Sequence, residues 1–168
     1  VIECKICNFK HIIPIPTSKE LDLFYKKKFY GKIKPDYIKE HEKDLEWWDL
    51  VHKERYQKFE KYLKTKSRKI LEIGCGPGFF LKLGKELGWE VRGIEPSVQA
   101  SEYGRNMGLS IITGELNSQN LKGLGKFDVI YLEGVMEHLP DPAKAVKMCY
   151  KILKPGGLFC TIVANDYN

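Results

Sequence analysis

The 168-residue chain has no apolar run that approaches the roughly 20 residues of a membrane-spanning helix. It also lacks internal repeats, low-complexity tracts and the Gly-Lys-Ser/Thr triplet of a phosphate-binding P-loop. Its five cysteines are an odd number scattered along the chain, which argues against a disulfide framework. We therefore expect a protein of the reducing cytoplasm with no membrane partner.

Charge of one sign is not concentrated in the sequence either. The formal net charge is +6, and most of the basic excess precedes residue 70. A short basic run at 26–28 is followed by acidic residues between 40 and 46. A nucleic-acid surface needs basic residues gathered on one face, so this pattern is typical of a solvated surface. We expect no nucleic-acid partner.

Two regions of different character are present. Residues 1–66 hold a cysteine pair, a proline-containing stretch and a mostly helical segment from 36 to 64, so we expect an N-terminal helical cap. Residues 67–168 alternate between helix and strand, with strands expected at 69–73, 90–94, 109–113, 127–132 and 158–164. Ser97 and Asp141-Pro142 are typical helix starts. This order predicts an α/β fold with a doubly wound, mostly parallel sheet and a ligand crevice at the carboxyl ends of its strands.

The stretch from 69 to 78, Lys-Ile-Leu-Glu-Ile-Gly-Cys-Gly-Pro-Gly, joins an apolar strand to a helix through three glycines. Such a loop lets the backbone approach a nucleotide closely. The dinucleotide fingerprint G-x-G-x-x-G is not met, because Phe79 stands at its third glycine position and Gly78 precedes it. The spacing therefore disfavours a nicotinamide-dependent oxidoreductase.

In this loop the chain resembles the class I S-adenosylmethionine-dependent methyltransferases, and later motifs match that family in order over residues 68–165. The resemblance implies a Rossmann-like sheet of strand order 3-2-1-4-5, with S-adenosylmethionine or S-adenosylhomocysteine as the ligand. It also implies that Glu95 holds the ribose hydroxyls and that the segment 114–116 lines the adenine. The cofactor-binding residues expected are Glu72, Gly74, Cys75, Gly76, Gly78, Glu95, Pro96, Glu115, Leu116, Glu133 and Gly134.

The chemistry of these residues suits a sulfonium cofactor. One carboxylate at Glu95 can accept hydrogen bonds from both vicinal ribose hydroxyls, and such charge-assisted bonds are strong. The alternative is that Glu95 is only a solvated carboxylate at the end of a strand. Its position about 20 residues beyond the loop favours the ribose-binding role, by analogy with dinucleotide-binding proteins. Glu72 suits a ligand that carries an ammonium and a sulfonium. Cys75 is expected to contribute only its backbone.

Methyl transfer from a sulfonium is an in-line displacement, in which orientation alone can supply about 7–11 kcal/mol of the barrier. The protein then needs only a base that deprotonates an oxygen or nitrogen nucleophile. His138, in the loop after the fourth strand, is the candidate base. The equal alternative is that His138 only packs at the start of the next helix. Glu133, Glu137 and His138 have the spacing of metal ligands, but one local cluster supplies too few for a hard ion.

The pair Cys4-x-x-Cys7 is half of a zinc site, and His11 and His41 are candidates for further ligands. Some methyltransferases that act on sugars carry an N-terminal zinc ribbon closed by a second cysteine pair. This chain shows no second pair, so two structural thiols near a β-turn are the alternative.

Aromatic residues gather between 24 and 48. They form either a lid over the acceptor pocket or the apolar side of helices docked on the sheet, and for Trp47 and Trp48 we expect the second. The family's sheet has two further strands with no counterpart before Asn168, so we expect the domain at 67–168 to be C-terminally incomplete. The fifth strand would then be an exposed edge through which copies can pair.

These expectations combine into a methyltransferase that modifies an oxygen, nitrogen or carbon atom of a small molecule, such as a sugar or a secondary metabolite. The acceptor class rests on the family resemblance alone. A non-catalytic module that binds S-adenosylmethionine and regulates or scaffolds is the alternative.

Overall fold

The computed structural model describes residues 2–3, 5, 10–11, 14, 16–25, 29, 32–65 and 67–164. A short antiparallel pair, β1 (Ile2–Glu3) and β2 (Lys10–His11), comes first. Three helices follow, α1 (Ser18–Phe24), α2 (Tyr37–Lys43) and α3 (Leu45–Tyr62). No helix in these ranges combines the length and the apolarity needed to cross a membrane.

The remaining elements alternate between strand and helix, as the sequence predicts. The strands are β3 (Lys69–Ile73), β4 (Glu90–Glu95), β5 (Ile111–Thr113), β6 (Phe127–Glu133) and β7 (Leu153–Ile162). The helices are α4 (Phe79–Glu86), α5 (Val98–Asn106), the short 3₁₀ helix η2 (Met136–His138) and α6 (Pro142–Ile152). These five strands pair in parallel in the order β5-β4-β3-β6-β7, which confirms the predicted 3-2-1-4-5 order.

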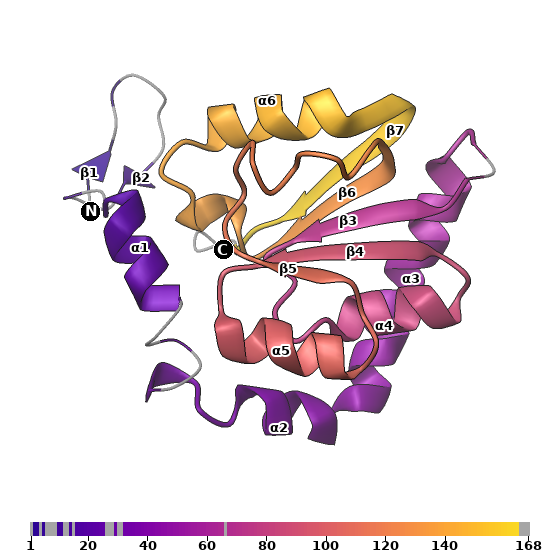
Figure 1. The fold of residues 1–168 in the computed structure, drawn as a ribbon, viewed down its shortest axis with the longest axis horizontal. Helices are drawn as coiled ribbons and strands as arrows, with labels where there is room; N and C mark the ends of the chain where they lie inside the picture. Colours follow the sequence, from indigo (N-terminus) through magenta and orange to yellow (C-terminus); the bar gives the residue numbers. More distant parts are fainter. Residues whose placement is uncertain are drawn as a thin grey trace.

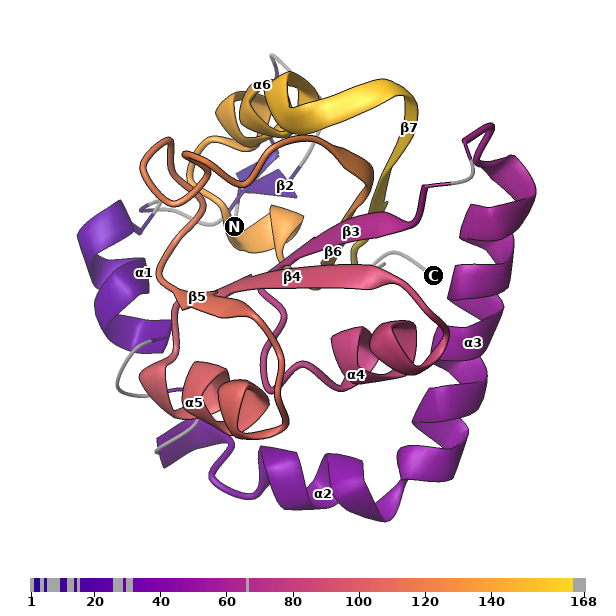
Figure 2. The same cartoon turned by 45° about the vertical axis from the view of Figure 1, so that its right-hand side comes forward.

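Helices cover both faces of this sheet, with α6 on one side and α4 and α5 on the other (Figures 1 and 2). The first core cluster joins α3 and α4 to the sheet through Tyr56, Phe80 and Tyr131. The second lies on the opposite face and joins α6 to the strands through Cys149 and Phe127. Burial on both faces explains why the central strands are almost continuously apolar.

The mostly helical segment predicted at 36–64 is confirmed and consists of two helices, because Asp44 leaves helical geometry at φ −105° and ψ 22° and lies between α2 and α3. Two predicted strand starts were wrong. The third strand begins at Ile111 rather than Leu109. The fifth strand begins at Leu153 rather than Leu158, since Leu153 already pairs with Phe127. The residues between these two leucines bulge out of the ladder, with Gly156 at φ 76°, before pairing resumes.

The helix starts follow the expected chemistry. The Ser97 hydroxyl accepts a hydrogen bond from the Ala100 N–H at 3.2 Å, and the Asp141 carboxylate accepts one from the Lys144 N–H at 2.9 Å. Both are N-caps. The division of the chain at residue 66 stays a prediction, as does pairing of copies through β7, which lies at one edge of the described sheet.

Candidate functional site

A cavity of about 540 Å³ lies at the carboxyl ends of β3, β4 and β6. The loops after these strands form one wall, and residues from α1, α2 and α3 form another. In Figures 1 and 2, α1 lies beside the ends of the strands, away from the helices that cover the sheet. Every residue predicted to bind the cofactor lines this cavity except Gly78.

The glycine loop is shaped by left-handed backbone. Gly74, Gly76 and Gly78 have φ values of 70°, 53° and 85°. A Cβ on Gly74 would lie 2.4 Å from Cγ2 of Val135, so a side chain there would collide with the loop after β6. Gly78 is the N-cap of α4 and packs towards Leu109, which explains why it shapes the loop without lining the cavity. The loop thus presents backbone to the cavity, as a nucleotide cradle requires.

Cys75 lies in the glycine loop between Gly74 and Gly76. Its side chain is buried, and its thiol lies against β4, where a Cβ added to Gly93 would come within 2.6 Å of Sγ. Burial raises the pKa of this thiol well above its ordinary value. A neutral, packed thiol is a poor nucleophile. That Cys75 contributes only its backbone to ligand binding stays a prediction.

Glu95 ends β4 and is buried, with 4% of its surface exposed. Its Oε2 accepts the Gly76 N–H and its Oε1 accepts the Ser97 N–H, each at 2.8 Å. Burial raises the pKa of Glu95 to about 7, although these two hydrogen bonds favour the charged form. Each carboxylate oxygen has a second lone pair, so two further donors from a ligand can be accepted.

Glu72, on β3, is buried, and its Oε2 has no hydrogen-bond partner among the described residues. Burial raises its pKa well above the ordinary value, and the neighbouring carboxyl groups of Glu133 and Glu95 raise it further. A buried polar atom without a partner costs about 1–3 kcal/mol. Glu72 lines the cavity beside the glycine loop, where a cationic ligand would balance this buried acceptor.

Glu133, at the end of β6, is held by two donors. Its Oε2 accepts a hydrogen bond from Arg55 Nη1 at 2.5 Å and one from the Tyr131 hydroxyl at 2.8 Å. Arg55 belongs to α3, so this ion pair ties the N-terminal helices to the strand that flanks the glycine loop. Gly134 follows at φ 61° and also lines the cavity.

The segment predicted to line the adenine, residues 114–116, is hydrogen-bonded directly to β4. The Gly114 N–H donates to the Glu95 carbonyl at 2.9 Å, and Asn120 Nδ2 donates to the Glu115 carbonyl at 2.7 Å. These bonds fix the backbone of the segment 114–116, whose three residues all line the cavity. Leu116 packs against the second core cluster and Pro96 lies beside Glu95 on the cavity wall.

His138 lines the cavity from η2 and is exposed. Its ring lies 6.0 Å from that of Tyr25, at an interplanar angle of 56°. Its role as a base stays a prediction. Across the described ranges, no group of three or more His, Cys, Asp or Glu side chains could hold a metal ion. Cys4 and Cys7 lie outside the described residues, and the zinc hypothesis gains no support.

Three residues of the N-terminal helices line or adjoin the cavity although the sequence did not predict this, and one of them, His41, was a candidate zinc ligand. His41 and His52 are buried and line the cavity, and Arg55 binds Glu133. The available signal was the polar interruption of the apolar stripe of α3 at His52 and Arg55. The expectation for Trp47 was wrong, since it is 57% exposed, whereas Trp48 packs on His41 and lines the cavity.

A family model described as "Methyltransferase domain" matches residues 41–167. A curated relative named "Ubiquinone biosynthesis O-methyltransferase" from Methylococcus capsulatus is 30% identical over 126 residues, covering 66% of this chain and 53% of the relative. A relative of the same name from Colwellia psychrerythraea is 35% identical over 95 residues, which cover 53% of this chain and 39% of the relative. The chain thus spans about half the length of the curated relatives it matches.

Solved structures show the same fold. The plantazolicin methyltransferase BpumL, in a complex with S-adenosylhomocysteine, has a TM-score of 0.60 at 19% identity, covering 80% of this chain and 53% of that one. A SAM-dependent methyltransferase from Archaeoglobus fulgidus has a TM-score of 0.51 at 27% identity, covering 63% of this chain and 48% of that one.

Proposed function

We propose, from the premise that this chain belongs to the class I S-adenosylmethionine-dependent methyltransferase family, that its cavity binds this cofactor and transfers the methyl group to a small-molecule acceptor. One observation carries the proposal. Carboxyl side chains from the ends of three adjacent strands line the same cavity as the glycine loop, and they are Glu72, Glu95 and Glu133.

The residues present fit the cofactor. The unpartnered Oε2 of Glu72 suits the ammonium of the methionine end, because a cation would satisfy a buried acceptor. Glu95 keeps lone pairs for two ribose hydroxyls while the Gly76 and Ser97 N–H groups hold its orientation. Glu115 and Leu116 would lie beside the adenine, on a backbone fixed by Asn120.

When bound, the cofactor supplies a methyl group on a positively charged sulfur, which a nucleophile displaces in line. The protein's part is then to orient the acceptor, exclude water and hold a proton acceptor near it. His138 is the residue that we propose for the last role, since it lines the cavity. The two named relatives, which are 30% and 35% identical to this chain over 126 and 95 aligned residues, are called O-methyltransferases, which supports a hydroxyl oxygen as the accepting atom.

Calorimetry tests the cofactor. We expect S-adenosylhomocysteine to bind in the micromolar range and NAD not to bind. Glu95→Ala should weaken binding at least tenfold, because one charge-assisted hydrogen bond is worth about 1.5–3 kcal/mol. Glu90→Ala is the matched control, since Glu90 begins the same strand and its side chain is 54% exposed. Binding of NAD without binding of S-adenosylhomocysteine would refute the proposal.

Transfer of a labelled methyl group separates the enzyme from a non-catalytic scaffold. The acceptors to screen are hydroxylated small molecules, including sugars and phenolic secondary metabolites. Product formation that falls at least a hundredfold in His138→Ala, with S-adenosylhomocysteine affinity kept, supports His138 as the base. Unchanged turnover in that variant would remove His138 from this role.

A further inference from the structure

The wall of the cavity opposite the strand ends is aromatic. We call it the aromatic wall and define it by Tyr25, Tyr37, His41, Trp48 and His52, which α1, α2, α3 and their junctions bring to the cavity. None of these side chains carries a formal charge at neutral pH unless a histidine is protonated. This wall therefore differs in character from the carboxylate-bearing strand ends.

Two histidines on this wall have buried ring nitrogens without partners. Nε2 of His41 and Nδ1 of His52 make no hydrogen bond to any described residue, although the side chains are only 8% and 3% exposed. Both residues line the cavity, and their ring centroids are 6.1 Å apart. A buried polar atom without a partner costs free energy, so two of them on residues that line one cavity indicate that a ligand completes them.

The packing fixes the orientation of these rings. His41 stacks on Phe79 at 4.3 Å and 5° and on Trp48 at 4.6 Å and 12°. Two parallel rings at these distances cover both faces, so His41 can meet a ligand only through its edge. His52 meets Phe80 edge to face at 5.3 Å and 85°. Each imidazole edge is thus held in place before a ligand arrives.

Both histidines are kept neutral. Burial lowers the pKa of His41, and burial together with the nearby Arg55 lowers the pKa of His52 to about 3. A neutral imidazole cannot balance the charges of the methionine end of a cofactor. It offers one hydrogen-bond donor and one acceptor, and a hydroxyl group can pair with either.

We propose that His41 and His52 bind the methyl acceptor, and that the acceptor is an uncharged molecule with a flat ring and a hydroxyl group. The ring would pack on the aromatic wall while the hydroxyl pairs with the two imidazole edges. This inference rests on the proposed function and deepens it, because it assigns the acceptor class and the residues that recognise it.

Phenol is the probe, and toluene is the matched ring without a hydroxyl. The full chain, saturated with S-adenosylhomocysteine and labelled with ¹⁵N at histidine, is titrated with each and followed by NMR. We expect phenol to shift the ring nitrogens of His41 and His52 and to bind roughly tenfold more tightly than toluene. Equal affinity for the two probes, or phenol binding that leaves both rings unshifted, would overturn the inference.

Variants supply the second test. His41→Phe and His52→Phe keep a ring of similar size, so each should fold and should lose most of the preference for phenol. Lys53→Gln is the control, because Lys53 is the exposed neighbour of His52 on α3 and its change should leave the preference intact. A phenol preference that survives in both histidine variants contradicts the inference.

Binding of S-adenosylhomocysteine to the same variants separates the two proposals. We expect its affinity to stay within about twofold of the wild type in His41→Phe and His52→Phe, because an aromatic wall for the acceptor lies outside the cofactor's contacts. A tenfold loss in these variants would assign the histidines to the cofactor, overturning the inference but leaving the proposed function. A wild-type chain that fails to bind it would refute the proposed function and the inference with it.

Discussion

Three carboxyl groups at the ends of adjacent strands are in different states, although all three residues are glutamates. Glu133 is paired with Arg55, Glu95 accepts two backbone N–H groups, and Glu72 has one oxygen without a partner in the described part of the chain. Burial without a partner favours the neutral form, and pairing favours the charged form. The neighbours of each residue, not its type, therefore decide what the residue can do in the cavity.

The raised pKa of Glu95 predicts a pH dependence of cofactor binding. Because ribose hydroxyls donate to the charged form, affinity for S-adenosylhomocysteine should rise as the pH rises towards 7 and level off above it. Below pH 7 the affinity should change by at most about tenfold per pH unit. Calorimetry at pH 6, 7 and 8 measures it.

Glu95→Gln is the control for this titration, since an amide keeps the shape of the side chain and does not titrate in this range. It should bind weakly and with the same affinity at all three pH values. A slope that persists in Glu95→Gln would assign the titration to another group and contradict this prediction.

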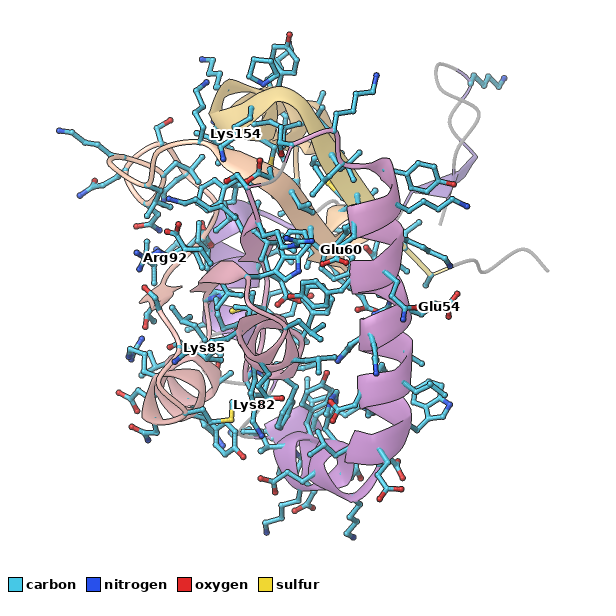
Figure 3. The ribbon with its side chains drawn as sticks, turned by 90° about the vertical axis from the view of Figure 1, so that its right-hand side faces the viewer. Glu54, Glu60, Lys82, Lys85, Arg92 and Lys154 are labelled. Atoms are coloured by element: carbon cyan, nitrogen blue, oxygen red, sulfur yellow. The ribbon has the colours of Figure 1, made fainter. Side chains whose placement is uncertain are left out.

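At the scale of the element, α3 has two faces with different functions. Its inner face packs Tyr56 and Phe59 into the first core cluster and presents His52 to the cavity. Its outer face is solvated, and Figure 3 shows Glu54 on the side of the helix that faces away from the strands. Arg55 reaches from this helix to the end of β6, so α3 both covers the sheet and holds one wall of the cavity.

Arg55→Gln should lower the free energy of unfolding by about 1–3 kcal/mol, because it leaves the half-buried carboxylate of Glu133 with one donor fewer. Lys58→Gln, on the outer face of the same helix, breaks an ion pair with Glu54 in which each side chain is 63% exposed. That change should lower the free energy of unfolding by no more than about 0.5 kcal/mol. Urea unfolding of both variants measures the contrast, and equal losses would contradict the assigned role of Arg55.

At the scale of the whole molecule, Asp128 joins four segments of the chain. This fully buried carboxylate accepts hydrogen bonds from the Thr65 hydroxyl at 2.8 Å, the Lys69 N–H at 2.9 Å and Lys154 Nζ at 2.8 Å. The segment after α3 and the strands β3, β6 and β7 therefore meet at one residue. Lys154 extends from the base of β7, where Figure 3 labels it.

Asp128→Asn should lower the free energy of unfolding at pH 7 by about 1–3 kcal/mol, since an amide replaces a buried acceptor of three donors. Burial alone would raise the pKa of Asp128, but hydrogen bonds from Lys154, Thr65 and the Lys69 N–H hold it below its ordinary value of 3.8. The stabilisation is thus present above pH 3.8 and is lost as the pH falls through the lower pKa of the folded state.

The measurement is urea unfolding of the wild type and Asp128→Asn from pH 7 towards pH 3, where their difference should shrink. Asp36→Asn is the control, because Asp36 pairs with Lys39 on the surface and its loss should be small at every pH. A difference between wild type and Asp128→Asn that does not change with pH would refute this role for the carboxylate.

Much of the fold follows from local sequence chemistry. The apolar runs predict all five strands of the sheet, and Ser97 and Asp141 start their helices as N-caps where expected. The start of β7 was missed, because it depends on pairing between Leu153 and Phe127 across the sheet.

The sequence by itself determined the alternation of strand and helix, the parallel sheet and the glycine loop, because periodicity, caps and glycine spacing are local and survive without tertiary contacts. The strand order was implied by the family resemblance, and the pairing of the strands confirms it. Only the tertiary structure decided that His41 and His52 lie at the same cavity as Glu72 and Glu95. Burial removes water from those side chains, and burial is a property of packing between distant segments, so sequence spacing could not reveal which polar atoms would remain without partners.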